Sequence, residues 1–143
     1  MTTPANLDEL VHTLGTGTAS PDGFLIVSPD NLLAAARCLH NPKGLDYEYL
    51  DMITAVDYPD FFELVYRIQS LKKNEVVTIK TLLKKENPAV PSLTALWPGA
   101  NYQEREVYDL FGITFTGHPN LTRMMLWEGF QGYPLRKDYV VDA

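Results

Sequence analysis

An alternation of apolar and polar side chains over residues 49–68 is the sequence feature that most constrains the fold. The alternating set lies on both sides of a turn at residues 57–60 and comprises Leu50, Met52, Thr54, Val56, Phe62, Leu64, Tyr66 and Ile68. Because successive side chains of a strand point to opposite faces, the pattern predicts two strands that turn this set toward one face. The short turn predicts a tight antiparallel hairpin.

The segments around the hairpin add a third strand and three helices. A turn at residues 72–74 and alternation over residues 77–83 predict the strand, with its lysines on the solvent face. Helical spacing predicts helices over residues 3–14, 29–41 and 100–111 and a short helical turn at 92–97. A short apolar run predicts a brief strand at 23–28. The expected fold class is α+β, a two-layer sandwich with helices packed on a mainly antiparallel sheet.

The end of the chain combines structure breakers with apolar residues. Gly117, Pro119, Gly129, Gly132 and Pro134 exclude long regular elements, so this segment needs a surface to lie on. We expect an α+β core domain over residues 1–116 and an extended C-terminal tail over residues 117–143 that packs on a partner subunit. In the chain alone this tail is expected to be loose or artificially packed.

Length, charge and cysteine content exclude several classes of protein. The 143 residues, 45% of them hydrophobic, are enough for one domain. A net charge of -6 argues against a nucleic-acid binder, and we interpret the basic stretch 67–85 as the solvated face of a strand. The single cysteine, Cys38, rules out an intrachain disulfide, cannot supply the thiolates of an iron-sulfur cluster, and fits a reducing cytoplasmic setting.

The hydropathy pattern offers no direct route to a membrane. No apolar run reaches the roughly 18 residues that span a bilayer, and the N-terminal residues lack the features of a signal peptide. We therefore expect membrane association only through partners.

Residues 104–109 hold the densest group of charges, and they favour a structural role over a reaction centre. Side chains two apart on a helix point about 200° apart, so Glu104 and Glu106 cannot share a proton or a metal. Glu106 and Asp109 share a face and suit the helix surface, where Arg105 and Asp109 would form an i,i+4 pair. The three histidines lack the spacing of metal ligands. The sequence thus predicts no catalytic, cofactor-binding or metal-ligating residues.

Two ordered motifs, within a match that is dense from about residue 91 to 139, resemble one known family. The run of residues 104–113, EREVYDLFGI, is followed by Phe115, Gly117, His118, Pro119, Leu121 and Arg123. It resembles the C subunit, or 30 kDa subunit, of respiratory complex I, the proton-pumping NADH:quinone oxidoreductase. Residues 132–139, GYPLRKDY, are similar to the same family's Gly-His-Pro-Leu-Arg-Lys-Asp-Tyr ending. Tyr133, Thr122 and Val140 depart from the family's usual residues, which affects local contacts.

The resemblance implies a non-catalytic structural subunit of the peripheral arm, on the cytoplasmic side of an energy-coupling membrane. Such a subunit binds no cofactor of its own and packs against the large D-type (49 kDa-like) subunit. NADH or another donor, the iron-sulfur clusters and quinone belong to the assembly. The family motif and expected partner interface comprise Glu104, Arg105, Glu106, Tyr108, Asp109, Phe111, Gly112, Gly117, His118, Pro119, Arg123, Pro134, Leu135, Arg136, Lys137, Asp138 and Tyr139.

The expected mechanism is positional, because the helix and tail would fix the D-type subunit within electron-transfer range of cluster and quinone. In this hypothesis basic residues pair with partner carboxylates or backbone carbonyls, while Glu104, Glu106 and Asp109 meet basic groups or cap local structure. The basic residues concerned are Arg105, Arg123, Arg136 and Lys137.

Two alternative functions stay open. One is the equivalent subunit of an energy-converting hydrogenase or of another complex with a different donor. The other is a stand-alone small-molecule enzyme that uses Glu106, Asp109 and His118.

Overall fold

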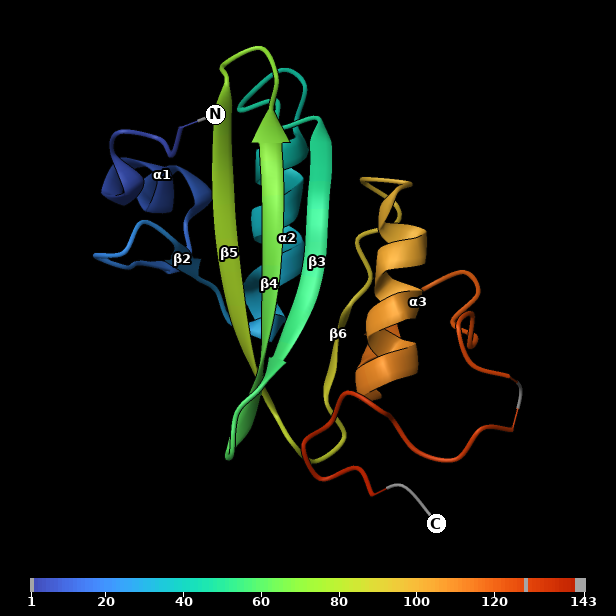
Figure 1. The fold of residues 1–143 in the computed structure, drawn as a ribbon. Helices are drawn as coiled ribbons and strands as arrows, with labels where there is room; N and C mark the ends of the chain where they lie inside the picture. Colours follow the sequence, from blue (N-terminus) through green and yellow to red (C-terminus); the bar gives the residue numbers. More distant parts are fainter. Residues whose placement is uncertain (1, 128, 141–143) are drawn as a thin grey trace.

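Three long antiparallel strands form the centre of the fold in the computed structural model, which describes residues 2–127 and 129–140 (Figure 1). They are β3 (Tyr49–Asp57), β4 (Phe61–Ser70) and β5 (Glu75–Lys84). The short strands β1 (Thr18–Ala19) and β2 (Leu25–Ile26) complete a sheet with the order β1-β2-β5-β4-β3. Only the β2–β5 pair is parallel. The predicted hairpin and third strand are confirmed.

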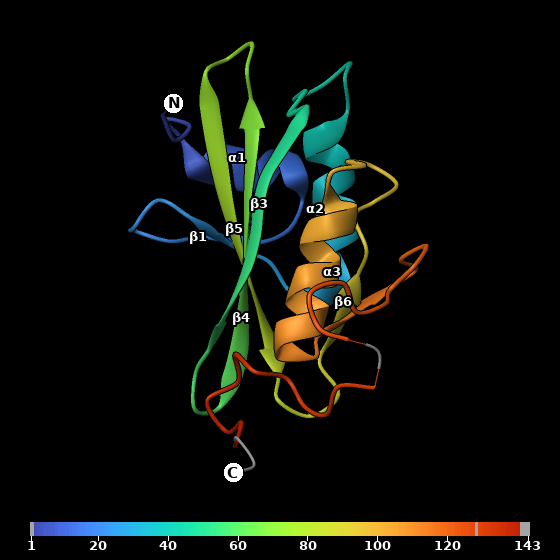
Figure 2. The ribbon, with the colours of Figure 1, turned by 45° about the vertical axis from the view of Figure 1, so that its right-hand side comes forward.

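Two helices cover one side of the sheet, α2 (Pro29–His40) and α3 (Ala100–Phe111) (Figure 2). Helix α1 (Leu7–Leu14) packs against α2 and β1. A parallel pair of short strands, β6 (Ala89–Pro91) and β7 (Thr114–Thr116), flanks α3 at its two ends in sequence. The structure is therefore the α+β sandwich that the sequence predicts.

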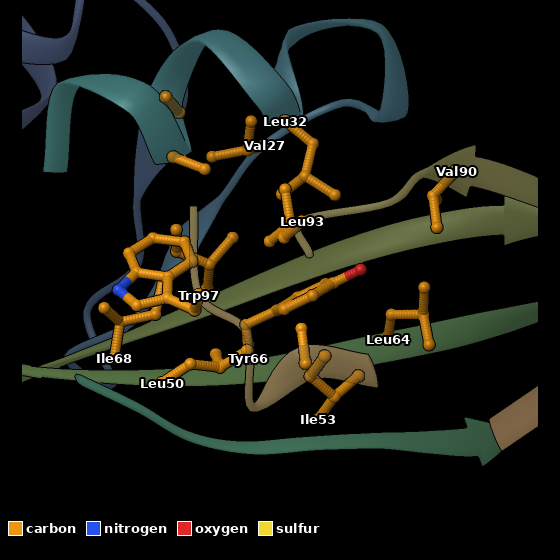
Figure 3. Close-up of a cluster of buried hydrophobic side chains, with 14 of the residues drawn as sticks. Val27, Leu32, Leu50, Ile53, Leu64, Tyr66, Ile68, Val90, Leu93 and Trp97 are labelled. Atoms are coloured by element: carbon orange, nitrogen blue, oxygen red, sulfur yellow. The ribbon is translucent and has the colours of Figure 1, made fainter. Parts of the chain in front are cut away.

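The buried core joins the helices to the sheet. Figure 3 shows Val27 and Leu32 on the helical side, facing the β4 side chains Leu64 and Tyr66. Fully buried side chains alternate along β4 and β5, as the period of two predicts. Apolar burial on both layers stabilises the sandwich, because each helix covers a stripe of the sheet that water would otherwise contact.

The predicted orientation of β3 is wrong beyond Leu50. A β-bulge between Leu50 and Met52 shifts the register against β4. Because a bulge adds one residue to the strand, it reverses the face of every residue that follows. Ile53, Ala55 and Asp57 therefore point into the core, and Val56 is 37% exposed.

Helix boundaries follow local capping signals. Helix α1 begins later than predicted, at Leu7, because the Asn6 side chain accepts a hydrogen bond from the Glu9 N–H and acts as N-cap. Gly112 ends α3 with a left-handed φ of 76°, as predicted. Residues 94–96 form turns in the segment where a short helical turn is predicted.

The tail has no helix or strand among its described residues beyond β7. Figure 1 shows it running alongside α3 and then across the lower end of that helix toward the β3–β4 turn. Residues 128 and 141–143 of the predicted tail lie outside the described residues. The division at residue 116 and packing on a partner stay predictions. No helix in the described ranges is long and apolar enough to cross a membrane.

Candidate functional site

Glu104 connects α3 to the segment that follows β6. Its carboxylate accepts hydrogen bonds from the Leu93 N–H at Oε1 and from the Ser92 hydroxyl at Oε2, both at 2.7 Å. The side chain is fully buried, whereas Glu106 is exposed. The two glutamates therefore point away from each other, as helix geometry predicts.

His118 fastens the start of the tail to the same helix. Its Nδ1 accepts the Asn120 N–H at 2.9 Å, so in the neutral ring Nε2 carries the proton and donates to the Asn101 carbonyl at 3.2 Å. The imidazole is buried, and Nε2 lies 3.9 Å from Glu104 Oε2. The His118 ring therefore binds a backbone carbonyl of α3 within the chain.

Burial sets the acidity of this group of side chains. It raises the pKa of Glu104 to about 7, although the hydrogen bonds from Leu93 and Ser92 act in the opposite direction. Burial also raises the pKa of the Tyr66 hydroxyl, and the nearby Glu104 carboxylate adds to that increase. Glu104 is consequently a buried carboxyl group that gains or loses a proton near neutral pH.

Asp109 organises the tail that crosses α3. Its Oδ2 accepts three successive backbone N–H groups, from Met124 at 3.1 Å, Met125 at 2.7 Å and Leu126 at 3.1 Å. Its Oδ1 lies 3.3 Å from Arg123 Nε, and the side chain is fully buried. The three hydrogen bonds to Oδ2 and the ion pair with Arg123 offset the cost of burying a carboxylate.

The predicted surface position of Asp109 and its i,i+4 pair with Arg105 are wrong. Arg105 instead donates to the Thr122 carbonyl and hydroxyl, both at 3.2 Å. The physical reason is that the tail brings Arg123 and three amides to Asp109, and these buried donors replace a solvated partner on the helix surface.

We call residues 121–127 and 129–140 the strap. Arg123 closes its first loop, because Nη1 donates to the Phe130 carbonyl at 3.0 Å and Nη2 to the Gly132 carbonyl at 2.6 Å. Arg136 donates to the Phe111 carbonyl at 2.5 Å, and its guanidinium lies over the Tyr133 ring at 5.0 Å. The strap is thus held by arginines that bind main-chain carbonyls.

A second buried carboxylate holds the far end of the strap. Asp57, at the end of β3, accepts the Lys137 N–H at 2.7 Å and forms an ion pair with Lys85. Between the two carboxylates the Leu135 N–H donates to the Leu110 carbonyl at 3.0 Å. The strap is therefore attached to the domain at both ends and at a point between them.

Close packing at the end of α3 explains why position 112 of the motif is a glycine. A Cβ on Gly112 would lie 2.7 Å from two carbons of the Tyr133 ring, and the residue has a positive φ. The strap thus lies directly against the helix terminus at a point where only glycine fits.

A hollow of about 840 Å³ separates part of the strap from α3. Tyr108, Phe130 and Tyr133 line it together with Arg123, whose guanidinium lies 4.7 Å from the Tyr133 ring centre. In the described ranges, no three His, Cys, Asp or Glu side chains are grouped to hold a metal ion.

The structure brings most, but not all, of the motif residues together. The pair Glu104 and His118 forms one cluster, and Asp109, Arg123 and the residues around Gly112 form another. Exposed motif positions outside these clusters are Glu106, Gly117, Pro119, Leu135, Lys137 and Asp138. Sequence reasoning missed Ser92 and Asp57. Asp57 points inward in the same alternation as Ile53 and Ala55. This signal could have identified Asp57, but only if the β-bulge after Leu50 had been known.

The geometry defines an α+β protein in which two buried carboxylates hold a strap across a helix. A family model described as "Respiratory-chain NADH dehydrogenase, 30 Kd subunit" matches residues 25–143. The C subunit of the NADH-quinone oxidoreductase of Roseiflexus castenholzii is 42% identical over 133 residues, which cover 91% of this chain and 76% of that relative. The mitochondrial 30.4 kDa subunit of NADH-ubiquinone oxidoreductase of Neurospora crassa is 44% identical over 118 residues, covering 80% of this chain and 41% of that one.

Solved structures agree with these relatives. The trypsin-resistant fragment (1-134) of Nqo5 has a TM-score of 0.65 and 26% identity, and the match covers 80% of this chain and 98% of that one. A chain from the membrane-bound sulfane sulfur reductase, an archaeal respiratory membrane complex, has the same fold, with a TM-score of 0.78, 23% identity, and 94% and 83% of the two chains covered. The chain belongs to the family of the 30 kDa subunit, or C subunit, of respiratory-chain NADH dehydrogenase. The resemblance noted in the two motifs is confirmed.

Proposed function

We propose that the chain is a non-catalytic structural subunit in the peripheral arm of a proton-translocating NADH:quinone oxidoreductase. In this role it docks the large D-type subunit and keeps the quinone site within electron-transfer range of a cluster. The observation that carries the proposal is the family match over residues 25–143, which includes α3 and the strap.

The contacts of the motif residues support a positional role. Glu104 and Asp109 use their carboxylates to bind Ser92, Leu93 and the strap amides inside the chain. A group committed to such bonds shapes a surface, whereas an acid or base must reach a reacting proton. The chain itself is proposed to bind no cofactor, while NADH or another donor, the iron-sulfur clusters and quinone bind to other subunits.

The same proposal places the chain on the cytoplasmic side of an energy-coupling membrane, attached through its partners alone. The D-type subunit and other peripheral-arm subunits are the expected contacts. The relatives named as C subunits of NADH-quinone oxidoreductases support NADH as the electron donor of the assembly.

Purification of the tagged chain from its own host, after mild solubilisation of membranes, tests the proposal. We expect a D-type subunit, cluster-bearing subunits and membrane subunits in the same fraction, together with NADH-dependent quinone reduction. A large partner with nickel-binding cysteines and no NADH activity would instead identify a hydrogenase-type assembly. A chain without partners that turns over a small molecule would restore the enzyme hypothesis and contradict the proposal.

Arg105 gives a narrower test of the expected ion pairs with the partner. Its guanidinium binds Thr122 within the chain and also lies 6.0 Å from the Tyr102 ring centre. We expect Arg105→Ala to reduce both the recovered assembly and its quinone reductase activity. Undiminished assembly and activity would remove Arg105 from the docking scheme.

A further inference from the structure

Among the described residues three carboxylates are buried, and Glu104 differs from the other two in its surroundings. Asp57 and Asp109 each have a basic partner, Lys85 and Arg123 respectively. In the described ranges, no lysine or arginine forms an ion pair with Glu104. A buried carboxylate without a cation is destabilised relative to its neutral form, so the interior favours a proton on Glu104.

Neutral groups from three segments face the carboxylate of Glu104. The segment after β6 supplies a backbone N–H and the Ser92 hydroxyl. Strand β4 supplies Tyr66, whose hydroxyl stays protonated because burial raises its pKa well above the usual value. The loop after β7 supplies His118, with Nε2 at 3.9 Å. The site therefore holds donors for a carboxylate but no fixed positive charge to keep it ionised.

The histidine of this group is not positioned to take up the proton. His118 Nδ1 accepts the Asn120 N–H at 2.9 Å, and Nε2 lies 3.2 Å from the Asn101 carbonyl. A second proton on the ring would have to bind Nδ1 and would meet an N–H donor there. Protonation of His118 thus requires the turn at residues 118–120 to open, which leaves Glu104 as the proton acceptor of the group.

Two hydroxyl groups connect Glu104 to the border of the domain. Ser92 Oγ lies 2.7 Å from Glu104 Oε2 and 2.9 Å from Thr94 Oγ1, and either hydroxyl of the second pair can be the donor. Ser92 is 9% exposed, Thr94 is half-buried, and the next residue, Ala95, is exposed. The oxygens thus form a chain from the buried carboxylate toward solvent.

This chain can satisfy its hydrogen bonds in both charge states of the carboxyl group. When Glu104 is ionised, the Thr94 hydroxyl donates to Ser92 and the Ser92 hydroxyl donates to Oε2. When Oε2 carries a proton, it donates to Ser92, Ser92 donates to Thr94, and the Thr94 hydroxyl turns outward. In both states Oε1 accepts the Leu93 N–H and Ser92 Oγ accepts the Thr94 N–H. Only hydroxyl hydrogens change place, so no backbone rearrangement is needed.

We infer that Glu104 is a proton-binding site with a built-in path to solvent, in which the hydroxyls of Thr94 and Ser92 pass the proton between the surface and the buried carboxylate. In one transfer, a hydronium ion or a buffer acid gives a proton to Thr94 Oγ1, which gives its own proton to Ser92 Oγ. The Ser92 proton then passes to Glu104 Oε2. Each hydroxyl ends with one hydrogen, the carboxylate gains one and loses its charge, and release runs in reverse.

The inference goes beyond the proposed function, because it concerns the chain alone and does not depend on partner subunits. It adds proton binding to a structural role. A failure of assembly in the host would contradict the proposed function and leave this site untouched, whereas the two experiments below act on this site only.

Carbon NMR of the full-length chain, labelled at the side-chain carboxyl carbon of glutamate, tests whether Glu104 binds the proton. We expect one resonance that titrates with a midpoint at a pH of about 7 and is missing in Glu104→Gln. Ser92→Ala should move this midpoint to higher pH, because the ionised form loses a donor. A Glu104 resonance that is still that of the ionised form at about pH 5 would overturn the inference.

The rate of proton uptake tests the path. A light-triggered pH jump, followed by the infrared absorption of the carboxylate with the Glu104→Gln signal subtracted, measures this rate. We expect Thr94→Val to slow uptake by about tenfold or more, because a methyl group cannot relay a proton. Its midpoint should change less than that of Ser92→Ala, since Thr94 does not contact the carboxylate directly.

Two controls separate the hydroxyl from packing. Thr94→Ser keeps the hydroxyl and should keep the wild-type rate. Thr78→Val removes a half-buried threonine hydroxyl on β5, opposite Arg67, and should leave the rate unchanged. The amide infrared bands of each sample verify the fold, and if Thr94→Val does not fold, Thr94→Ala against Thr94→Ser makes the same comparison.

Two results would overturn the path. An unchanged rate in Thr94→Val would show that the proton reaches Glu104 by another route. Equal slowing in Thr94→Val and Thr94→Ser would show that the rate depends on packing at this position and not on the hydroxyl.

Discussion

At the scale of single residues, the Asp109 carboxylate carries more of the strap's order than any motif cation. It receives three amides and an arginine in a position without solvent. Hydrogen bonds to a charged group contribute roughly 1.5–3 kcal/mol each, but their sum is limited by the desolvation of the charge. The net effect of removing the charge is therefore a few kcal/mol.

We predict that Asp109→Asn lowers the free energy of unfolding by about 3 kcal/mol, because Arg123 loses its carboxylate and the strap amides lose a charged acceptor. Urea denaturation of the isolated chain measures the change. Glu106→Gln on the same helix is the control, since Glu106 is exposed and should shift stability by less than about 0.5 kcal/mol. Equal effects of the two substitutions would contradict the internal role of Asp109.

Glu104 predicts a pH dependence of stability. Its pKa rises from 4.5 to about 7 on folding, so the folded protein binds more protons than the unfolded chain between those values. The stabilising contribution is complete below about pH 4.5 and is lost as the pH rises through 7, by at most about 3 kcal/mol.

Unfolding curves of wild type and Glu104→Gln between pH 5 and 8 measure this dependence. Subtracting the two curves removes the contribution of the carboxylates that both proteins share. The difference is the contribution of Glu104, because glutamine does not titrate. We expect the stability of the wild type relative to the variant to fall as the pH rises. A difference that is flat or increases with pH would mean that the Ser92 and Leu93 donors outweigh burial.

At the scale of elements, α3 is the point where four parts of the chain meet. Glu104 binds the segment after β6, Asp109 binds the strap, and the Asn101 carbonyl receives His118. Gln103 accepts the Ile53 N–H of β3 at 2.6 Å, close to the β-bulge. Helix α3, with Glu104 and Asp109 of its EREVYD motif, thus connects these neighbouring elements to one another.

The end of α3 gives a prediction with an internal control. Gly112→Ala should lower stability by about 2 kcal/mol or more, because it strains a positive φ and brings a methyl group against Tyr133. Gly99→Ala, at the start of the same helix, should change stability by less than about 1 kcal/mol, because its φ is -62° and open space surrounds its Cβ position. Thermal unfolding of both variants measures the contrast, and similar melting temperatures would contradict it.

Periodicity and capping predict the elements of this fold well, because both depend on neighbouring residues. The hairpin, the third strand and the end of α3 at Gly112 follow from such signals. The β3 orientation does not, since a bulge is set by pairing with β4. The partners of Asp109 were not predictable either, because they come from a strap with no periodic pattern, 15 to 17 residues further along the chain.

At the scale of the whole molecule, the strap and the sandwich are joined by two carboxylates from different elements. Asp109 belongs to α3, and Asp57 belongs to the sheet. If the strap detaches from the sandwich as one unit, the loss of both anchors cannot lower the stability by more than the free energy with which the strap packs on the sandwich. The two anchors should therefore be coupled in stability.

A double-mutant cycle of Asp57→Asn and Asp109→Asn tests this coupling. We predict that the double variant is less destabilised than the sum of the single variants, by about 1 kcal/mol, because the second substitution acts on a strap that the first has already loosened. Glu75→Gln is the control partner for Asp109→Asn, since Glu75 binds Tyr47 at the start of β5, away from the strap. That control cycle should be additive within about 0.5 kcal/mol. Additivity in the first cycle would mean that the two ends of the strap fold independently.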